Sequence, residues 1–522
     1  MPHFAPTLSK PLLPGEGRGP VSSARPGPGL RRETTGGRPR RHALLPLAAA
    51  LTLLAGCGGG EDYEPEIRAD EKKIGAEQHP QLLAEFGGSY RASEAAYAGR
   101  VGEKIAAAAG LEGECTFTLV NSDVVNAFAV PGCYIYVTRG LMGIVNSEAE
   151  LASVLAHEVG HIVAAHNRRQ RNRSLWRSIG VWAVGTVTGS EDLARIAGRA
   201  AEYFTLRYSR KQEYEADDLG VRYLAAAGYD PYAAGDMLGA LGRNEQYMGR
   251  TRGRDEARAI PEWARTHPLA GNRAERAARA AAATGVADGE LPELEVPYLS
   301  ELDGLLYGDD PAQGFVQGRR FAHPVMRIGF EAPQGFTLTN SPQAILIEGT
   351  DGLRGEFGGG PMPQGGLPAY AEGLVRALLR GAPAEAGTAE AVRINGLPAL
   401  LLPVLVQTRE GAIELSIAAY DGGDGGAYHF IMVAPPAEAS RASIGALFGS
   451  FRLLSPEEAR SLRPRLIRTV RVGPGQTPAT LAGLMASEHP LDHFMMLNGL
   501  SPDAALKPGE MVKIITFAPA RS

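Results

Sequence analysis

The stretch Ser147–His166, SEAELASVLAHEVGHIVAAH, predicts a buried helix with one reactive face. Ser147 can cap its N-terminus, while Glu150, three residues further on, can accept a hydrogen bond from the backbone N–H of the capping residue. Apolar residues then recur at helical spacing and form a stripe that packs into a core. They are Leu151, Val154, Leu155, Val159, Ile162 and Val163.

An H-E-x-x-H sequence within this stretch suits a zinc site. His157 and His161 are four residues apart, so both rings lie on one side of the helix and can bind one ion. Glu158 lies about 100° around the helix from His157, within reach of a metal-bound water, which makes it the expected general base. His166 is rotated about 140° from His161 on an ideal helix, so we expect it to be structural. Chance would place this motif in roughly one chain in a hundred of this length, so it needs a third ligand as support.

A catalytic zinc site has a third protein ligand and an open fourth position. The metzincin continuation, with Gly at 164 and His at 167, is excluded because the chain has Ala164 and Asn167. The remaining source is a glutamate from a following helix, and the candidates are Glu191, Glu202, Glu213 and Glu215. Glu213 is favoured because it shares a helix face with Asp217, whereas Glu215 lies about 200° away and is expected to face solvent. A solvated acidic face is the alternative for the Glu213–Asp217 pair.

Four further segments accompany the H-E-V-G-H motif in a fixed order: N-A-F-A-V-P-G at 126–132, I-Y-V-T-R-G-L at 135–141, S-R-K-Q-E-Y-E-A-D-D-L-G at 209–220 and T-H-P-L-A-G-N-R at 266–273. With them, roughly residues 65–285 resemble the HtpX, BepA and CAAX-prenyl-protease family of gluzincin metallopeptidases, and most of all its periplasmic BepA branch. The resemblance implies one Zn²⁺ per chain.

The resemblance also assigns roles to residues. It implies that zinc is bound by His157, His161 and Glu213, with Glu158 as the base. Asp217 falls at the position that the family treats as a proton donor. His267 matches a histidine that can cap the zinc in a closed, self-inhibited state, and a structural role at a helix start is the alternative.

In the resembling family, the segment that contains Asn126, Ala127 and Phe128 forms a strand edge beside the zinc cleft. An extended substrate can pair with such an edge by main-chain hydrogen bonds, which tolerates many sequences. We therefore expect an endopeptidase that cleaves unfolded or misassembled envelope proteins. The alternatives are an envelope assembly chaperone or scaffold with a self-inhibited peptidase site and, more weakly, a cell-wall amidase.

Residues 1–56 are expected to be a signal peptide, of which the first forty or so, rich in Pro, Gly and Arg, are disordered or mis-started. The apolar run 43–55 is too short to span a bilayer, and it ends in L-A-G-C, which resembles a lipoprotein box with Cys57 as the lipidated residue. Removal of residues 1–56 changes the formal charge from −5 to −11, because eight Lys or Arg and two Asp or Glu are lost. An acidic chain argues against a nucleic-acid partner. The expected location is the bacterial periplasm, with a lipid anchor in the inner or outer membrane.

The pattern predicts an α+β protein of several domains. Residues 57–290 form a mainly helical zinc metallopeptidase domain with a small β-sheet at the cleft. In it, Cys115 and Cys133 are either bridged or free, and the apolar piece Ser174–Thr188 is a core helix or, alternatively, a lid.

Residues 291–460 are predicted to form a small α+β domain of unknown role. Short β-like runs occur at 344–347, 400–406, 413–419 and 429–433, and helical stretches near 370–379 and 440–448. Residues 461–522, the C-terminal module, carry a strand, a Gly-Gln-Thr turn, Leu-Asn-Gly and Lys-Pro-Gly-Glu in an order that resembles a βααβ lysin motif. That resemblance implies contact with peptidoglycan, and docking on the rest of the protein is the alternative.

Overall fold

The computed structural model describes residues 65–90, 93–171, 208–251, 263, 267, 272–350, 352–379, 383–408, 411–423, 425–501 and 503–519. The predicted signal peptide, Cys57 and the Ser174–Thr188 piece lie outside these residues. Among the described residues, no helix is both long enough and apolar enough to cross a membrane.

Helices α4 (Glu148–Val163) and α8 (Arg210–Ala226) pack against each other in antiparallel orientation in the core. They carry His157, His161 and Glu213. They approach closely because glycine replaces a side chain at each contact: a Cβ at Gly160 would lie 2.9 Å from the Ala216 carbonyl oxygen, and one at Gly220 would lie 3.2 Å from the backbone nitrogen of His157. This close crossing brings the inward face of α8 onto the histidine face of α4.

The start of α4 differs in one detail from the prediction. The Ser147 hydroxyl accepts a hydrogen bond from the Glu150 N–H at 3.0 Å, as predicted for an N-cap. The Glu150 carboxylate, however, accepts from the N–H of Asn146, also at 3.0 Å, and not from that of Ser147. The reciprocal bond therefore ties the loop before the helix, one residue further upstream.

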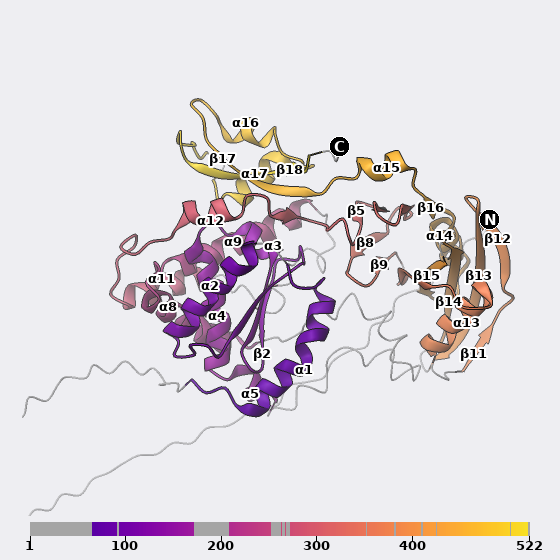
Figure 1. The fold of residues 1–522 in the computed structure, drawn as a ribbon, viewed down its shortest axis with the longest axis horizontal. Helices are drawn as coiled ribbons and strands as arrows, with labels where there is room; N and C mark the ends of the chain where they lie inside the picture. Colours follow the sequence, from indigo (N-terminus) through magenta and orange to yellow (C-terminus); the bar gives the residue numbers. More distant parts are fainter. Residues whose placement is uncertain are drawn as a thin grey trace, which may run out of the picture. The chain divides into compact units, whose positions relative to one another are not determined.

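A three-stranded sheet lies beside α4, with the order β1 (Thr116–Val120), β3 (Tyr134–Thr138), β2 (Ala127–Val130). Strands β1 and β3 are parallel, β2 and β3 are antiparallel, and β2 is an edge strand. The other helices of this part are α1 (Ala69–Glu85), α2 (Ser93–Ala108), α3 (Arg139–Ile144), α5 (His166–Arg171), α9 (Ala233–Thr251), α11 (Arg273–Ala283) and α12 (Glu295–Glu301) (Figure 1).

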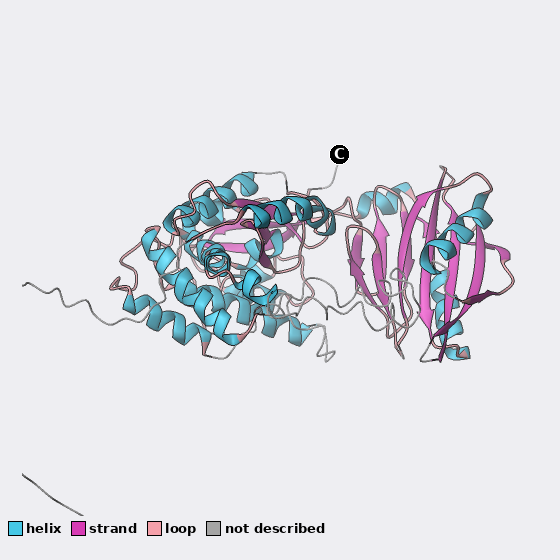
Figure 2. Cartoon of the chain, turned by 90° about the horizontal axis from the view of Figure 1, so that it is seen from below, coloured by secondary structure: helices cyan, strands magenta, loops and turns pink. Residues whose placement is uncertain are grey.

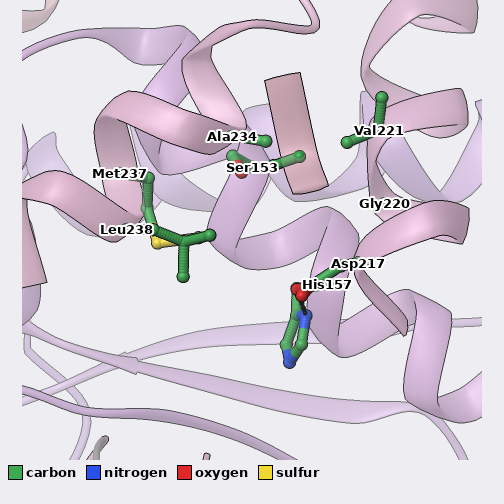
Figure 3. A pocket seen from close by; sticks show the side chains of 9 residues that line it. Ser153, His157, Asp217, Gly220, Val221, Ala234, Met237 and Leu238 are labelled. Carbon is green, nitrogen blue, oxygen red and sulfur yellow. Dashed lines mark ion pairs between the residues drawn. The ribbon is translucent and has the colours of Figure 1, made fainter. Parts of the chain in front are cut away.

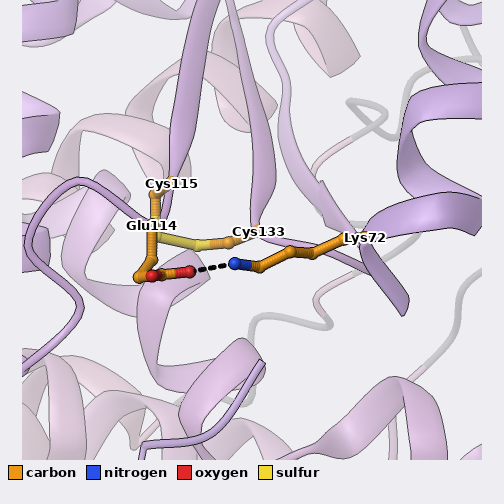
Figure 4. Close-up of a disulfide and its surroundings, with 4 residues drawn as sticks. All are labelled: Lys72, Glu114, Cys115 and Cys133. Carbon is orange, nitrogen blue, oxygen red and sulfur yellow. Dashed lines mark hydrogen bonds and ion pairs between the residues drawn. A yellow bond between two sulfur atoms is a disulfide. The ribbon is translucent and has the colours of Figure 1, made fainter. Parts of the chain in front are cut away.

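Cys115 and Cys133 form a disulfide, which resolves the two alternatives left by the sequence. The bridge joins the residue before β1 to the residue before β3, with the Cα atoms 4.6 Å apart, and it lies beside the ion pair of Lys72 and Glu114 (Figure 4). Cys133 has a φ of 59°, a left-handed conformation that is uncommon for residues other than glycine.

The middle part is built on an eight-stranded antiparallel sheet (Figure 2). Its strands are β8 (Thr337–Asn340), β9 (Ile345–Glu348), β10 (Arg354–Pro361), β11 (Ala384–Ala386), β12 (Glu390–Ile394), β13 (Leu397–Thr408), β14 (Gly411–Asp421) and β15 (Gly426–Ala434). Odd-numbered residues of β14 and β15 pack under α13 (Gly366–Leu379), whereas even-numbered ones pack with α14 (Glu438–Gly449) on the opposite face. The predicted β-runs and helical stretches of this region are confirmed as β9, β13, β14, β15, α13 and α14.

A smaller sheet, in the order β16 (Arg452–Leu453), β7 (Ile328–Glu331), β6 (Arg320–His323), β5 (Phe315–Gln317), shares a core with the α14 face. Helix α15 (Pro456–Ser461) leads out of this region.

The C-terminal module has the element order β17 (Arg465–Arg471), α16 (Pro478–Ala482), α17 (Pro490–Leu497), β18 (Met511–Phe517). Strand β17 pairs with β18 on one side and with β4 (Leu306–Tyr307), which precedes the middle part in sequence, on the other. Helix α17 packs on α9, and the buried residues of the module belong to the same core cluster as those of α2, α4 and the small sheet. The module is thus joined to the part of the chain that carries the H-E-x-x-H helix.

Candidate metal centre

Four buried side chains converge between α4 and α8. His157 and His161 come from α4, Glu213 comes from the first turn of α8, and His267 comes from the segment before α11. One nitrogen or oxygen of each lies within 4.8 Å of those of the others. The structure therefore brings together the three predicted ligands and the predicted capping histidine.

The distances within this cluster are short. His161 Nε2 lies 3.0 Å from His157 Nε2, and each of these nitrogens lies 3.6 Å from a Glu213 oxygen. His267 Nδ1 lies 3.0 Å from Glu213 Oε1 and 3.2 Å from His157 Nε2. Three imidazoles and one carboxylate in such a group match the donors and the coordination number that zinc takes in proteins.

Each α4 histidine has a second partner at its other ring nitrogen. His157 Nδ1 lies 2.9 Å from Asp217 Oδ1, one helical turn after Glu213 on α8 (Figure 3). His161 Nδ1 lies 2.8 Å from His166 Nδ1, and His166 Nε2 lies 3.1 Å from Glu215 Oε2. Partners at Nδ1 fix the ring orientation so that both Nε2 atoms point into the cluster.

The prediction that Glu215 faces solvent was wrong, and His166, predicted to be structural, lies closer to His161 than an ideal helix would place it. Helix α4 ends at Val163, and Ala165 has a φ of 51°, so the chain turns and His166 points back to His161. Glu215 does not face solvent, because it bonds to His166 and forms an ion pair with Arg169 at 3.0 Å. An ideal helix extended through Ala165 could not show either contact.

The ionisation of this region favours metal ligation. Burial lowers the pKa of His161, with the neighbouring imidazolium charges as further causes, and burial with the charge of Arg169 lowers the pKa of His166 to about 3. Both rings are therefore neutral near pH 7, as ligation requires. Burial raises the pKa of Glu213, but contact with His267 and the charges of His157 and Arg273 outweigh it, so its pKa is lowered.

The Glu158 side chain is buried beside the cluster. It is 1% exposed, and neither of its carboxylate oxygens has a hydrogen-bond partner with good geometry among the described residues. His267 Nε2 lies 3.5 Å from its Oε1. Burial raises the pKa of Glu158 to about 7, with the nearby Glu213 adding to the increase, so this carboxylate can take up a proton near neutral pH.

Arg273, which the sequence analysis did not single out, completes the acidic side of the site. It is 1% exposed and donates to both oxygens of Asp217, at 2.9 and 2.7 Å, while its Nη1 lies 3.0 Å from Glu213 Oε2. Burial would raise the pKa of Asp217, but the hydrogen bond to His157 and the Arg273 charge lower it well below its usual range. Asp217 is therefore ionised, accepts two hydrogen bonds from Arg273 and lies next to His157 Nδ1.

The predicted strand edge lies next to the cluster. Ala127 and Phe128 belong to edge strand β2, and Asn126 immediately precedes it. Asn126 is 1% exposed, and neither its side-chain oxygen nor its side-chain nitrogen has a partner among the described groups. Such a buried amide is costly unless something else can hydrogen-bond to it.

Trp263 and His267 lie beside this edge. Trp263 is fully buried, its ring stacks on His267 with the centroids 4.3 Å apart, and its backbone N–H donates to the Val125 carbonyl at 3.3 Å. The cavity beside His157, lined also by Ser153 and Asp217, measures about 10 Å³ (Figure 3), and the one beside His161 about 20 Å³. Neither of these two cavities could hold one residue of a peptide.

An H-E-x-x-H helix, a glutamate from the next helix and an adjoining edge strand define a metallopeptidase domain. Residues 92–281 match the family described as peptidase family M48. This part of the chain is a domain of that family, as the resemblance in sequence predicted.

Two relatives illustrate the similarity. The mitochondrial metalloendopeptidase OMA1 of Arabidopsis thaliana is 36% identical over 162 residues, which covers 31% of this chain and 30% of that protein. The beta-barrel assembly-enhancing protease of Yersinia pestis is 31% identical over 166 residues, which covers 30% of this chain and 32% of that protein. The chain thus spans about a third of the length of these relatives.

A solved structure, that of cyanobacterial PsbP from Synechocystis, is 17% identical and covers 28% of this chain and 98% of its own, with a TM-score of 0.22. This similarity is too low to bear on fold or function.

Proposed function

We propose that this protein is a zinc-dependent endopeptidase of the bacterial cell envelope that cleaves unfolded or misassembled envelope proteins. The observation that carries the proposal is the set of four buried donors within 4.8 Å of one another, built on the H-E-x-x-H helix. The names of two relatives, a metalloendopeptidase and a beta-barrel assembly-enhancing protease, support it.

The donor set fits zinc. His157, His161 and Glu213 would hold one ion per chain, and the partners of both histidines at Nδ1 already orient them for it. Bound zinc would lower the pKa of a water and polarise the scissile carbonyl.

The remaining chemistry belongs to the side chains. Glu158, buried and with a pKa near neutrality, takes a proton from the attacking water and delivers it to the leaving amine. Asp217 is held ionised by Arg273, so we assign it to orienting His157 and not to donating a proton. Arg273 in turn balances the two carboxylates beside it.

The substrate would be bound as an extended chain along the outer edge of β2. Its backbone would pair with residues 126–128, and the unpartnered amide of Asn126 would serve a backbone group of the substrate. Main-chain pairing makes few demands on sequence but requires an extended segment, which folded proteins rarely offer. A preference for unfolded or misassembled chains follows from this mode of binding.

The lipobox-like sequence at Cys57 supports a periplasmic enzyme that is lipid-anchored to the inner or outer membrane. The βααβ order of the C-terminal module supports its comparison with lysin motifs, so peptidoglycan is a candidate second partner.

The second candidate function is an envelope assembly chaperone or scaffold whose peptidase is shut. It is favoured by the buried His267 and Trp263, which occupy the space between the metal cluster and Val125 at the strand edge. In that case, cleavage would occur only after the side chains of His267 and Trp263 have left the metal cluster.

The test uses the soluble form that starts after Cys57, and it measures zinc content and cleavage of denatured casein. The variant is Glu158→Gln, and Glu103→Gln, at an exposed position on α2, is the control. Zinc in all three proteins, with cleavage lost only in Glu158→Gln, would support the peptidase. Zinc in all three without cleavage in any would favour the scaffold, and a parent that binds no zinc would contradict the proposal.

A further inference from the structure

One lysine of the C-terminal module contacts the segment that leads into the H-E-x-x-H helix. Lys513 lies on β18 and is 0% exposed. Its ammonium group donates to the carbonyl oxygens of Gly143 at 2.9 Å and Val145 at 2.8 Å. These carbonyls belong to the end of α3 and the loop that leads into α4.

The same short loop is held from its other side by Glu150. The Glu150 carboxylate, 5% exposed, accepts from the N–H of Asn146. Burial lowers the pKa of the Lys513 ammonium, and the charge of Glu150 counters this effect. A buried ammonium is costly unless hydrogen bonds and an opposite charge compensate it. Here both are present, so Lys513 and Glu150 together fix the segment that starts α4.

The position of Lys513 is itself fixed by the module. The side-chain amide of Asn498, at the end of α17, accepts from the Lys513 N–H at 2.7 Å and donates to the Lys513 carbonyl at 2.9 Å. Ile467 of β17 lies against Gly143: a Cβ added at Gly143 would be 3.2 Å from the Ile467 Cδ1. The lysine therefore acts from a rigid support and not from a flexible tail.

We propose that Lys513 positions the N-terminal end of α4, so that the C-terminal module is a required part of the metal centre. Helix α4 is continuous from Glu148 to Val163, and a shift of its first turn moves His157 and His161 relative to Glu213 on α8. The metal site would accordingly be completed only when the last residues of the chain have folded onto α4. A module used only as a wall-binding arm would not need this contact.

The test replaces the buried ammonium in the soluble form that starts after Cys57. Lys513→Met keeps the length of the side chain but removes its donors, and Lys507→Met, at an exposed position in the same module, is the control. Two quantities are measured: hydrogen exchange of the amides in residues 150–155, and zinc affinity by competition with a chromogenic chelator. We expect faster exchange and zinc binding weakened about tenfold in Lys513→Met, and parental values in Lys507→Met.

The inference would be overturned if Lys513→Met had parental exchange in α4 and parental zinc affinity, even with a lower unfolding temperature. If this variant does not fold, Asn498→Ala decides, because it loosens the support of Lys513 and leaves the ammonium in place. A smaller change in the same direction supports the inference, and parental values contradict it. The inference rests on the proposed zinc site only for the affinity measurement. Hydrogen exchange needs no metal, so a failure of the proposed function would be distinguishable.

Discussion

Arg273 binds both carboxylate oxygens of Asp217, at 2.9 and 2.7 Å, and both side chains are buried. The same guanidinium lies 3.0 Å from Glu213, so a single cation on α11 balances two anions on α8. Arg273 thus positions both Glu213, the proposed zinc ligand, and Asp217, which lies beside His157 Nδ1.

Replacement of Arg273 by alanine should damage both stability and metal binding. It leaves the carboxylates of Asp217 and Glu213 buried without their cation, which costs about 3 to 5 kcal/mol of unfolding free energy. Chemical denaturation of the metal-free protein measures this loss. Arg279→Ala, at an exposed position of the same helix, should change the unfolding free energy by less than about 0.5 kcal/mol. A similar stability for both variants would show that Arg273 is not needed for the charge balance.

His166 should control the zinc affinity of His161 without touching the metal. His166→Ala removes the partner 2.8 Å from His161 Nδ1, so the ring loses its preferred orientation. Loss of such a partner typically weakens metal binding about 10- to 100-fold. Competition with a zinc chelator measures the effect, and His489→Ala, at an exposed position in the C-terminal module, should bind zinc as the parent does. Unchanged affinity in His166→Ala would return His166 to a purely structural role.

The sequence predicted the residues of the metal cluster far better than the residues around them. His157 and His161 could be found because helical spacing places them on one face of α4. Glu213 could be found because it shares a face of α8 with Asp217 and because its segment resembles the family motif. His166 could not, since its position depends on the left-handed conformation of Ala165. Reasoning from an ideal helix assumes continuous helical backbone, so it could not predict the change of direction at Ala165.

Contacts between residues far apart in the sequence could not be predicted either. Arg273 lies 56 residues from Asp217, and Lys513 lies 368 residues from Val145. Only the packing of α11 on α8 and of the C-terminal module on α3 and α9 brings these residues together. The fold class and the strands of the middle part were predictable because alternating apolar residues and turn residues are local signals.

His267→Ala tests whether His267 holds the site in a closed state. It removes the imidazole that contacts Glu213 at 3.0 Å and stacks on Trp263, and it leaves His157, His161 and Glu213 in place. If this histidine holds the closed state, cleavage of denatured casein should rise at least about fivefold. Zinc content of the same preparation should match the parent, which separates opening from loss of metal. Parental activity with full zinc content would mean that His267 is a structural residue and would remove the support for a self-inhibited state.

The C-terminal module should make the protein acid-sensitive through His493. This histidine on α17 lies 2.7 Å from the Tyr307 hydroxyl and 2.9 Å from the Ser487 hydroxyl, and it stacks on Tyr247 of α9. Burial, with a smaller effect of the Arg465 charge, lowers its pKa to about 3. In the unfolded chain, its pKa returns to about 6.5.

Between these two pKa values, the unfolded chain binds a proton at this histidine that the folded protein does not. Stability should therefore be fully present above about pH 6.5 and fall as the pH is lowered towards 3, by about 1.4 kcal/mol per pH unit from this one group. His493→Gln cannot titrate, so its unfolding free energy should depend less steeply on pH by that amount between pH 4 and pH 6, measured by urea denaturation. The exposed His489→Gln should keep the parental slope. Equal slopes for parent and His493→Gln would show that His493 is protonated in the folded protein and that its contacts with Tyr307 and Tyr247 do not exclude the charge.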